Sequence, residues 1–488
     1  MDYQQLLLAL LPDLLVVVAL FAALGVDYSR LRGSRLAKRY QVACQISAAG
    51  LIAGLAVLLL QLTQAWSFTA LASMTEGQLV LTRGTLTVKA LLYGMGLGVL
   101  PLAKRDQITP QVSEYFALLL LATLGMGFVV TSRNLLGAFV ALELVSLSLY
   151  AMTVLNQASR ASAEAALKYL TFGAVASGFL LFGLSYLYGA TGQLDLTQMT
   201  DLQHSPLLVL AYLLIFVGLG FKLALAPFHL WAPDVYQNAP TPVAGWVGSG
   251  SKIAAAALLV AMLQPVFTSP ELKTELIPAL ATLAVASMVV GNLGALRQTN
   301  LKRLLAYSAI ANAGYLLVGV MAFTAEGNTS VIFYILVYSL ASLGAFGVIA
   351  VLTDTLGRDA EISDFNGCWK TTPGLAVAFL VFLLSLAGIP PLAGFLGKFY
   401  LFFAAIGAMP EAATWHDGFY WLVAFALIMS VVSLYYYLRV LKAFLVAPAD
   451  DEVPVKTGWA AGITLCVLAI AVLALGLWPE PLLTLLRH

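Results

Sequence analysis

Long apolar segments, each able to cross a bilayer, constrain this chain more than any other feature. A membrane-spanning helix needs about 20 mostly apolar residues, and about fourteen such segments can be placed between polar breaks. Hydrophobic residues make up 61% of the 488 residues and charged residues only 10%, against about 25% charged in an average soluble domain. The sequence therefore predicts an all-α, polytopic integral membrane protein.

The expected spans set the order of the chain. They cover residues 6–24, 42–63, 85–103, 113–131, 135–155, 165–190, 206–230, 241–263, 276–296, 302–323, 330–354, 373–407, 418–445 and 458–479. The first could be mistaken for a secretory signal, but its basic residues follow the apolar run instead of preceding it. We expect it to remain as the first transmembrane helix.

The basic residues predict the orientation, because cytoplasmic loops are enriched in Lys and Arg. Of the 25 basic residues, 16 fall in loops on the side of the first loop. The other side holds four, Arg83, Arg133, Lys273 and Arg487. This bias predicts that both termini face the periplasm or its equivalent.

Charge and cysteine content exclude several classes of function. The formal net charge is +1 and there is no long basic tract, so a nucleic-acid partner is not expected. The three cysteines, Cys44, Cys368 and Cys466, are far apart in the sequence. They predict neither a disulfide framework nor a zinc or iron–sulfur site. Any redox cofactor is therefore expected on another chain.

The five basic residues that we assign to spans and not to loops, together with one acid deep in an apolar helix, are the candidates for function. They are Lys89, Glu143, Lys168, Lys222, Lys252 and Lys398. A charge at the bilayer centre costs about 2.5–3.5 kcal/mol on insertion scales, so it normally faces a polar interior and has a partner. Keeping several of them suggests transport or a proton relay.

Two of these lysines also have a simpler explanation. Lys89 lies near the outer end of its span, where its side chain can reach the interface. Lys168 follows Glu164 by four residues, the better orientation for a helical ion pair. Glu143 and Lys222 lie deeper, where neither side chain can easily reach water, so a functional role is favoured for both.

Prolines interrupt two of the spans that carry these charges. Pro227 follows Lys222, and the pair Pro390 and Pro391 precedes Lys398. A proline removes a backbone donor and clashes with the preceding turn. Unwound backbone at membrane depth is tolerated only where it is buried in protein or lines a wet cavity. Each break marks a candidate polar site, although a kink that only aids packing is the alternative for a single helix.

The two breaks suggest an internal repeat, because paired interrupted helices in two halves are typical of transporter sites near the midplane. We expect two inverted five-helix repeats, at residues 111–265 and 276–447. Residues 1–110 would contribute three further helices and residues 456–488 the last one. The break falls in the fourth helix of each repeat.

Burial and pairing of the lysines predict proton-transfer chemistry. A lysine moved into an apolar interior releases its proton more readily, and an adjacent carboxylate opposes this. The hypothesis is that Glu143 is the partner of Lys222, and that Lys252 and Lys398 pass the proton along the membrane plane. Gly and Ser residues before Lys252 leave room for water there.

Weaker candidates lie just after the first break and near the end of the chain. His229 fits either a proton carrier or a structural hydrogen bond. Asp234 is expected to fix the same loop. Aromatic residues including Trp231 and the run 435–437 fit interfacial belts or packing.

Three long motifs resemble one family. They are LGFKLALAPFHLWAPDVYQNAPTPVAG, GNLGALRQTNLKRLLAYSAIANAGYLLVG and SLAGIPPLAGFLGKFYLF. These segments are similar to the antiporter-like subunits of respiratory complex I, with the subunit N branch as the best match. The resemblance covers nearly the whole chain. It implies an energy-converting NADH:quinone oxidoreductase in which other subunits hold FMN and iron–sulfur clusters and reduce quinone.

The resemblance also implies roles and partners. Glu143 and Lys222 match the paired glutamate and lysine of the family, Lys252 its connecting lysine, Lys398 the ionisable residue of the second broken helix, and Lys168 an auxiliary lysine. The partners implied are neighbouring membrane-arm subunits, the NADH-oxidising peripheral arm and the lipid bilayer.

One position departs from the family pattern. Asn312 stands where sister subunits often have histidine, and Asn cannot titrate. An accessory proton step there would need water, Tyr307 or Ser308.

Two other readings compete with this one. A subunit of a multi-subunit sodium/proton antiporter or membrane-bound hydrogenase would use the same kind of helices and lysines. A passive scaffold, in which buried charges only fix helix pairing, is the third.

Overall fold

The computed structural model describes residues 3–63, 78–156, 159–199, 202, 204–356, 361–408, 419–448 and 457–487. Within them the chain is mostly helical, with isolated bridges and no strand. Thirteen helices are long and apolar enough to cross a membrane. Two shorter ones, α16 (Pro373–Ala387) and α17 (Ala393–Gly407), follow each other and make a fourteenth crossing. The predicted fold class and number of spans are confirmed.

The helix bounds follow the predicted spans closely. The first half contains α1 (Tyr3–Val26), α2 (Leu36–Leu62), α4 (Arg83–Asp106), α5 (Val112–Thr131), α6 (Leu135–Val154), α7 (Arg160–Thr191), α8 (Pro206–Leu223), α9 (Ala232–Asn238), α10 (Thr241–Gly248) and α11 (Gly250–Leu263). The second contains α12 (Pro270–Leu296), α13 (Leu301–Val320), α14 (Ala325–Leu356), α15 (Cys368–Thr371), α16, α17, α18 (Tyr420–Leu445), α19 (Trp459–Leu477) and α20 (Glu480–Leu486). Two of the 16 basic residues counted on the side of the first loop, Arg358 and Lys456, lie outside the described residues.

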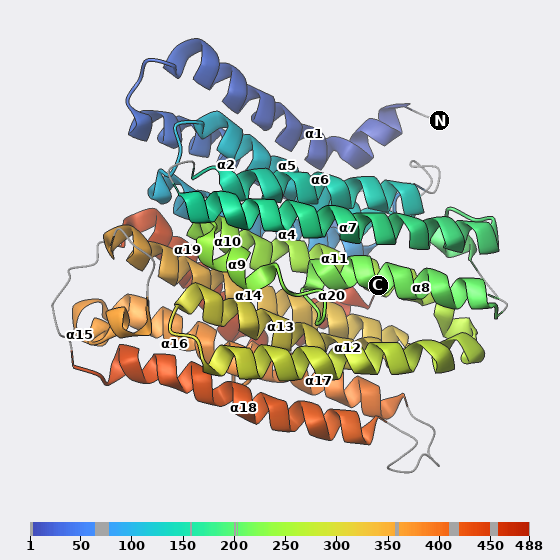
Figure 1. Ribbon diagram of the computed structural model, residues 1–488. Helices are drawn as coiled ribbons and strands as arrows, with labels where there is room; N and C mark the ends of the chain where they lie inside the picture. The colour runs from blue at the N-terminus through green and yellow to red at the C-terminus, as the bar shows by residue number, and fades with distance from the viewer. Residues whose placement is uncertain are drawn as a thin grey trace.

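The helices run side by side in one elongated bundle (Figure 1), with α1 and α2 at one edge and α18 at the other. Helix α14 forms the centre, because its most apolar 18-residue window is 100% buried. It packs against α10, α11, α13, α16, α17 and α19. A helix that is apolar all round belongs in such a core.

Polar residues fix where several helices begin. The side chains of Asn134, Ser205 and Asn300 each accept a hydrogen bond from a backbone N–H in the first turn of the following helix. Such N-caps satisfy donors that have no partner within the helix. They locate α6, α8 and α13, which carry Glu143, Lys222 and Ser308 of the candidate site.

Both predicted helix breaks are present. Helix α8 ends at Leu223, after which Ala224 takes a left-handed conformation with φ 60°. Helix α16 ends at Ala387, and Gly388 follows with φ 86°. A third break was not predicted. Span 241–263 is divided at Ser249 into α10 and α11, with no proline at that point to signal it.

Candidate functional site: a row of buried lysines

Three predicted lysines lie inside the bundle. Lys222, Lys252 and Lys398 are all buried, and Lys252 is only 1% exposed. They come from α8, α11 and α17 respectively. A buried ammonium needs acceptors or a favourable dipole to remain charged. The structure supplies these in a different way at each lysine.

Lys222 lies in the last turn of α8, where the helix dipole favours a cation. Its ammonium donates hydrogen bonds to Ser146 Oγ and, at 3.2 Å, to Tyr150 Oη. Both partners are on α6, at three and seven residues after Glu143. The lysine therefore faces a polar stripe along α6.

Glu143 does not contact Lys222 directly. Its Oε1 accepts a 2.5 Å hydrogen bond from Ser177 Oγ of α7. Within the described residues no ion pair joins Glu143 to Lys222. Ser146 lies one helical turn from Glu143, but its hydroxyl donates to Leu142 O at 2.6 Å, so Glu143 acts on Lys222 through its charge and not through this hydroxyl.

Lys252 binds the carbonyl end of the first broken helix. Its ammonium donates to Leu223 O at 2.9 Å and to Ala309 O of α13 at 3.1 Å. Leu223 is the last residue of α8, and such a carbonyl has no donor within its own helix. The break in α8 therefore creates the acceptor that holds Lys252.

Lys398 binds the carbonyl end of the second broken helix in the same way. Its ammonium donates to Ala387 O at 3.0 Å and Leu386 O at 3.3 Å, the last two carbonyls of α16. It also donates to Ser430 Oγ of α18 at 3.0 Å. A Cβ at Gly388 would lie 3.1 Å from Lys398 Cδ, so glycine permits both the left-handed turn and the close approach.

Polar side chains lie in the core between Lys252 and Lys398. Ser308, beside Ala309, shares a short hydrogen bond with Tyr437, whose ring lies 4.5 Å from that of Tyr436. Tyr436 Oη donates to Asn292 Oδ1 at 3.3 Å, and Asn292 Nδ2 donates to Tyr315 Oη at 3.1 Å. Lys398 Nζ lies 5.0 Å from the centre of the Tyr315 ring. Hydroxyl and amide groups therefore span the distance between the two lysines.

Asn312 cannot titrate, but it contributes hydrogen bonds to this network of polar side chains. Its amide donates to Ser308 O at 2.8 Å, and its Oδ1 accepts from Tyr334 Oη at 2.7 Å. Ser308 therefore lies within this network. The ring of Tyr307 packs against Gly294 instead, with its centre 6.0 Å from the Arg303 guanidinium.

The tyrosines of this network are the main residues that the sequence prediction missed. Of the two alternatives given for this run, packing holds for Tyr436 and Tyr437, which are fully buried, whereas Tyr435 is 63% exposed. The helical spacing of apolar residues along α18 could have placed Tyr436 and Tyr437 on its buried face. Their partners, Tyr315 and Tyr334, come from α13 and α14, which sequence spacing does not connect.

A second charge cluster joins α7, α9 and α13 on the predicted cytoplasmic side. Lys168 pairs with Glu164 at 2.8 Å, as predicted, and also with Asp234 at 2.8 Å. Asp234 accepts a further 2.8 Å bond from Arg303. The expectation that Asp234 fixes its loop is confirmed. His229, on the same loop, is half-buried and its Nδ1 has no hydrogen-bond partner among the described residues.

Replacing Asp234 with asparagine tests this loop contact. Burial raises the pKa of Asp234, but the hydrogen bonds from Lys168 and Arg303 lower it by a larger amount. The pKa of Asp234 therefore lies below its ordinary value of 3.8. A lowered pKa means that the stabilisation is present above pH 3.8 and is lost as the pH falls below it. We expect Asp234→Asn to lower the free energy of unfolding by about 1 kcal/mol at pH 7. The loss is no larger because solvent screens this partly exposed site.

Thermal unfolding of the purified protein at pH 7 and near pH 3.5 measures this loss. The difference between wild type and Asp234→Asn should shrink at the lower pH. Glu271→Gln, at an exposed site in the first turn of α12, is the matched control. An equal difference at both pH values would contradict a charge-based role.

Lys89 corrects another expectation. Instead of reaching the interface, it is 2% exposed and forms a 2.6 Å ion pair with Asp13 of α1. Asp13 lies inside the first predicted span and was overlooked. An acid directly after Pro12 in an apolar run was the available signal.

No metal site is evident in the described part of the chain. Nowhere in it do three or more His, Cys, Asp or Glu side chains gather so that they could hold a metal ion. Cys44, Cys368 and Cys466 are all free thiols.

The fold and the site define a class of protein. Interrupted helices whose carbonyl ends are bound by buried lysines are typical of ion-translocating membrane subunits. Residues 132–436 match the family described as NADH:quinone oxidoreductase/Mrp antiporter, TM. The chain is 45% identical to NADH-quinone oxidoreductase subunit N 2 of Acidobacterium capsulatum, over 100% of this chain and 99% of the relative. It is 43% identical to subunit N of Hirschia baltica, over 75% of each chain.

The solved structures agree with the sequence relatives. A chain of respiratory complex I from Thermus thermophilus with bound aureothin superimposes with TM-score 0.80 and 35% identity, over 98% of this chain and 100% of that one. A chain of the Mrp complex from Dietzia has the same fold, with TM-score 0.81 but only 22% identity, over 100% of this chain and 97% of that one. The chain belongs to the subunit N family of NADH-quinone oxidoreductases.

Proposed function

We propose that this chain translocates protons across the membrane as a membrane-arm subunit of an NADH:quinone oxidoreductase. Its partners are neighbouring antiporter-like and small membrane subunits and the peripheral arm that oxidises NADH. FMN, the iron–sulfur clusters and quinone belong to other subunits. The membrane is the bacterial inner membrane, with both termini on the periplasmic side. The competing proposal is that the chain is a subunit of a sodium/proton antiporter.

The observation that carries this proposal is the contact between lysines and helix ends. Lys252 and Lys398 bind carbonyls that only a broken helix leaves free. A partial negative charge at a helix C-terminus stabilises an ammonium without neutralising it. Each lysine can therefore hold a proton when the carbonyls are in place and release it when they move or when a nearby charge changes.

Each residue has a distinct part in this proposal. Glu143, one helical turn from Ser146 on α6, favours the protonated form of Lys222 by its negative charge. Lys252 takes the proton on, and the Ser308 network carries it toward Lys398. Lys168 and His229 contribute on the cytoplasmic side.

The domain organisation follows from the same proposal. Residues 111–265 and 276–447 form the two inverted repeats, each with one lysine-bound break. Residues 1–110 contribute α1, α2 and α4, and the last segment contributes α19 and α20, which pack against α14 and α4. Alternating access would involve small movements of the half-helices next to each break.

Purification of the tagged full-length chain in mild detergent tests the assignment. We expect flavin- and iron–sulfur-containing subunits to co-purify with NADH:quinone reductase activity. Vesicles containing the complex should acidify when NADH is added. Co-purification of other polytopic chains alone, with sodium-dependent proton exchange, would favour the antiporter instead.

A further inference from the structure

Three aromatic side chains are stacked next to Lys222. The Tyr150 ring packs edge-on against that of Tyr169, with the ring centres 4.5 Å apart. The Tyr169 ring lies nearly parallel to that of Trp231, with centres 4.4 Å apart and 10° between the planes. All three side chains are buried. We call Tyr150, Tyr169 and Trp231 the aromatic stack, which joins α6, α7 and the segment between α8 and α9.

The stack lies between Lys222 and the predicted cytoplasmic surface. At one end, Tyr150 Oη accepts a 3.2 Å hydrogen bond from the Lys222 ammonium. At the other end, Trp231 precedes Asp234 by three residues, and Asp234 pairs with Lys168. The side chains of Asp234 and Lys168 are 27% and 39% exposed. The stack therefore separates a buried ammonium from charges that reach solvent.

Close contacts hold both ends of the stack in place. A Cβ at Gly173 of α7 would overlap Tyr150 Oη, so glycine makes room for this hydroxyl beside Lys222. The indole N–H of Trp231 donates to Phe221 O at 3.0 Å, and Phe221 directly precedes Lys222. Because this N–H is the only polar group of the indole and is already bound, Trp231 cannot pass a proton on.

Ion pairs hold the same elements together. Lys168 Nζ lies 2.8 Å from Asp234 Oδ2, a contact that joins α7 to α9 just beside the Tyr169–Trp231 contact. Arg303 Nη1 of α13 binds the other oxygen of Asp234 at 2.8 Å. We call Lys168, Asp234 and Arg303 the latch. Moving α7 away from Trp231 would therefore break the Lys168–Asp234 pair as well.

The stack is closed in this structure. Parallel rings with centres 4.4 Å apart are close to van der Waals contact, because carbon atoms attract best at about 3.5–4.0 Å. A water molecule, roughly a sphere of 1.4 Å radius, does not fit between them. A proton moves through water or hydroxyl groups, so the contact between Tyr169 and Trp231 blocks the line from the latch to Lys222.

We propose that the aromatic stack is the barrier between Lys222 and the cytoplasmic solution, with Trp231 as the positioning residue that keeps it closed. This inference rests on the proposed proton translocation. When the latch loosens and Trp231 leaves Tyr169, water reaches the neutral amine of Lys222. The amine takes one proton from the cytoplasmic solution and becomes the ammonium. Closing the stack then prevents this proton from returning to the same side.

The test measures how fast a thiol next to Lys222 is modified from the cytoplasmic side. Ser146→Cys places this thiol on α6, at a site that is 0% exposed and one turn from Tyr150. The three native cysteines are first replaced by alanine. Inverted vesicles that hold the whole complex are treated, without NADH, with a charged methanethiosulfonate that does not cross membranes. Mass spectrometry of this chain gives the rate, which reports access because the thiolate reacts in water.

Two variants should open the barrier. Trp231→Ala removes the ring that closes the stack, and we expect modification to become about 10-fold faster or more. Asp234→Asn keeps every ring but loosens the latch, and it should give an increase of about 3-fold. With NADH, the Trp231→Ala vesicles should also take up fewer protons per NADH oxidised, because protons on Lys222 can return to the cytoplasmic side.

Two controls make the result specific to the stack. Trp231→Phe keeps a ring against Tyr169 and should stay close to the parent rate. Phe365→Ala removes a fully buried ring from another aromatic cluster, where it packs against Phe379 and Phe444. This variant should leave the rate unchanged.

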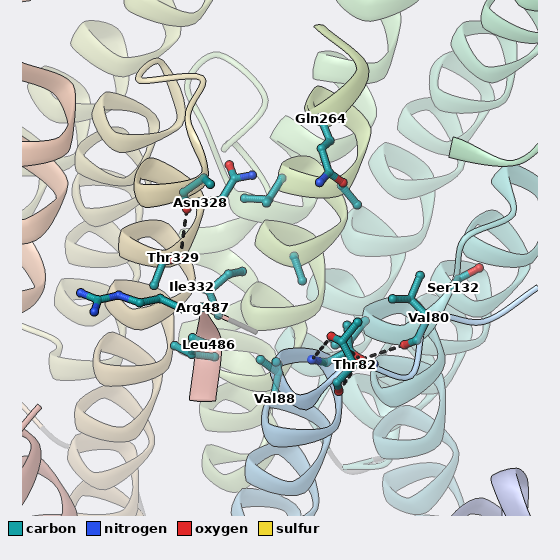
Figure 2. Close-up of a pocket in the computed structure, with 17 residues that line it drawn as sticks. Val80, Thr82, Val88, Ser132, Gln264, Asn328, Thr329, Ile332, Leu486 and Arg487 are labelled. Carbon is teal, nitrogen blue, oxygen red and sulfur yellow. Dashed lines mark hydrogen bonds between the residues drawn. The ribbon is translucent and has the colours of Figure 1, made fainter. Parts of the chain in front are cut away.

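The direction of access needs its own control. A cavity of about 310 Å³ lies at the predicted outer ends of α4, α11 and α14. Figure 2 shows Thr82 of α4 on one wall, with Gln264 and Asn328 across from it. Because this side offers a different approach, right-side-out vesicles are treated in parallel. From the outer side, Trp231→Ala should be modified no faster than its parent.

The outcomes separate this inference from the proposed function. Modification of the parent as fast as that of Trp231→Ala, or the parent rate in both Trp231→Ala and Asp234→Asn, overturns the barrier. If Trp231→Ala does not assemble, Asp234→Asn decides alone. If Lys222→Met loses NADH-driven uptake while both stack variants keep the parent rate, only the barrier fails. If Lys222→Met keeps uptake, the proposed function itself fails.

Discussion

Replacing Lys222 with methionine is expected to abolish most NADH-driven proton uptake. Methionine matches the length of the stem but carries no proton, and Ser146 and Tyr150 would lose the cation that they bind. Proton transfer through a positioned group contributes about 10²–10⁴-fold to a rate, so we expect uptake to fall about 100-fold. The loss should be measured in sealed vesicles, per assembled complex.

Two further variants make the result specific. Lys222→Arg keeps the charge but cannot release a proton, and it should fail nearly as completely. Lys370→Met, at an exposed site in α15, should behave as wild type. Unchanged proton uptake per NADH in a fully assembled Lys222→Met complex would leave this lysine with a scaffold role only.

The contacts of the lysines explain why removing the single charge of Lys222 should stop proton transfer along the row. Lys252 and Lys398 contact no carboxylate among the described residues, and carbonyl groups hold both ammonium groups. A carbonyl end is a weaker counter-charge than a carboxylate, so a nearby charge can change the proton occupancy. A stronger partner would hold the proton throughout the cycle.

Much of this arrangement could be predicted because the physical signals were local. A run of about 20 apolar residues predicts a span without knowledge of its neighbours. Pro227 and the Pro390–Pro391 pair located two breaks for the same reason. Lysines within such runs stand out against an apolar background.

The rest depended on contacts between distant segments. No local signal shows that Lys252 reaches Leu223 O, because the two residues are 29 positions apart and on different helices. The break at Ser249 has no proline to indicate it. Asp13 differs from these cases, because the sequence itself shows an acid inside an apolar span. Only its pairing with Lys89 could not be predicted from local sequence.

Gly394→Ala is expected to prevent stable folding, although the substitution adds only one methyl group. A Cβ at this position, in the first turn of α17, would lie 1.8 Å from Ser385 O of α16. The clash is with backbone and no flexible side chain can move to relieve it. The Gly394 N–H also donates to Ser385 Oγ at 3.1 Å, which fixes the two half-helices at this distance.

We expect a loss of about 3 kcal/mol or more, at the upper end for overpacking, because the half-helices must separate to accept the methyl group. Separation would also move Ala387 O away from Lys398, so any protein that does assemble should translocate protons slowly. Gly407→Ala, in the last turn of the same helix, meets nothing within 4 Å and serves as the control. Thermal stability and the yield of assembled complex are the measurements. If Gly394→Ala matched Gly407→Ala in both, the close contact of α16 and α17 would not be needed for folding, and the lysine-bound break would have to tolerate wider spacing than the structure shows.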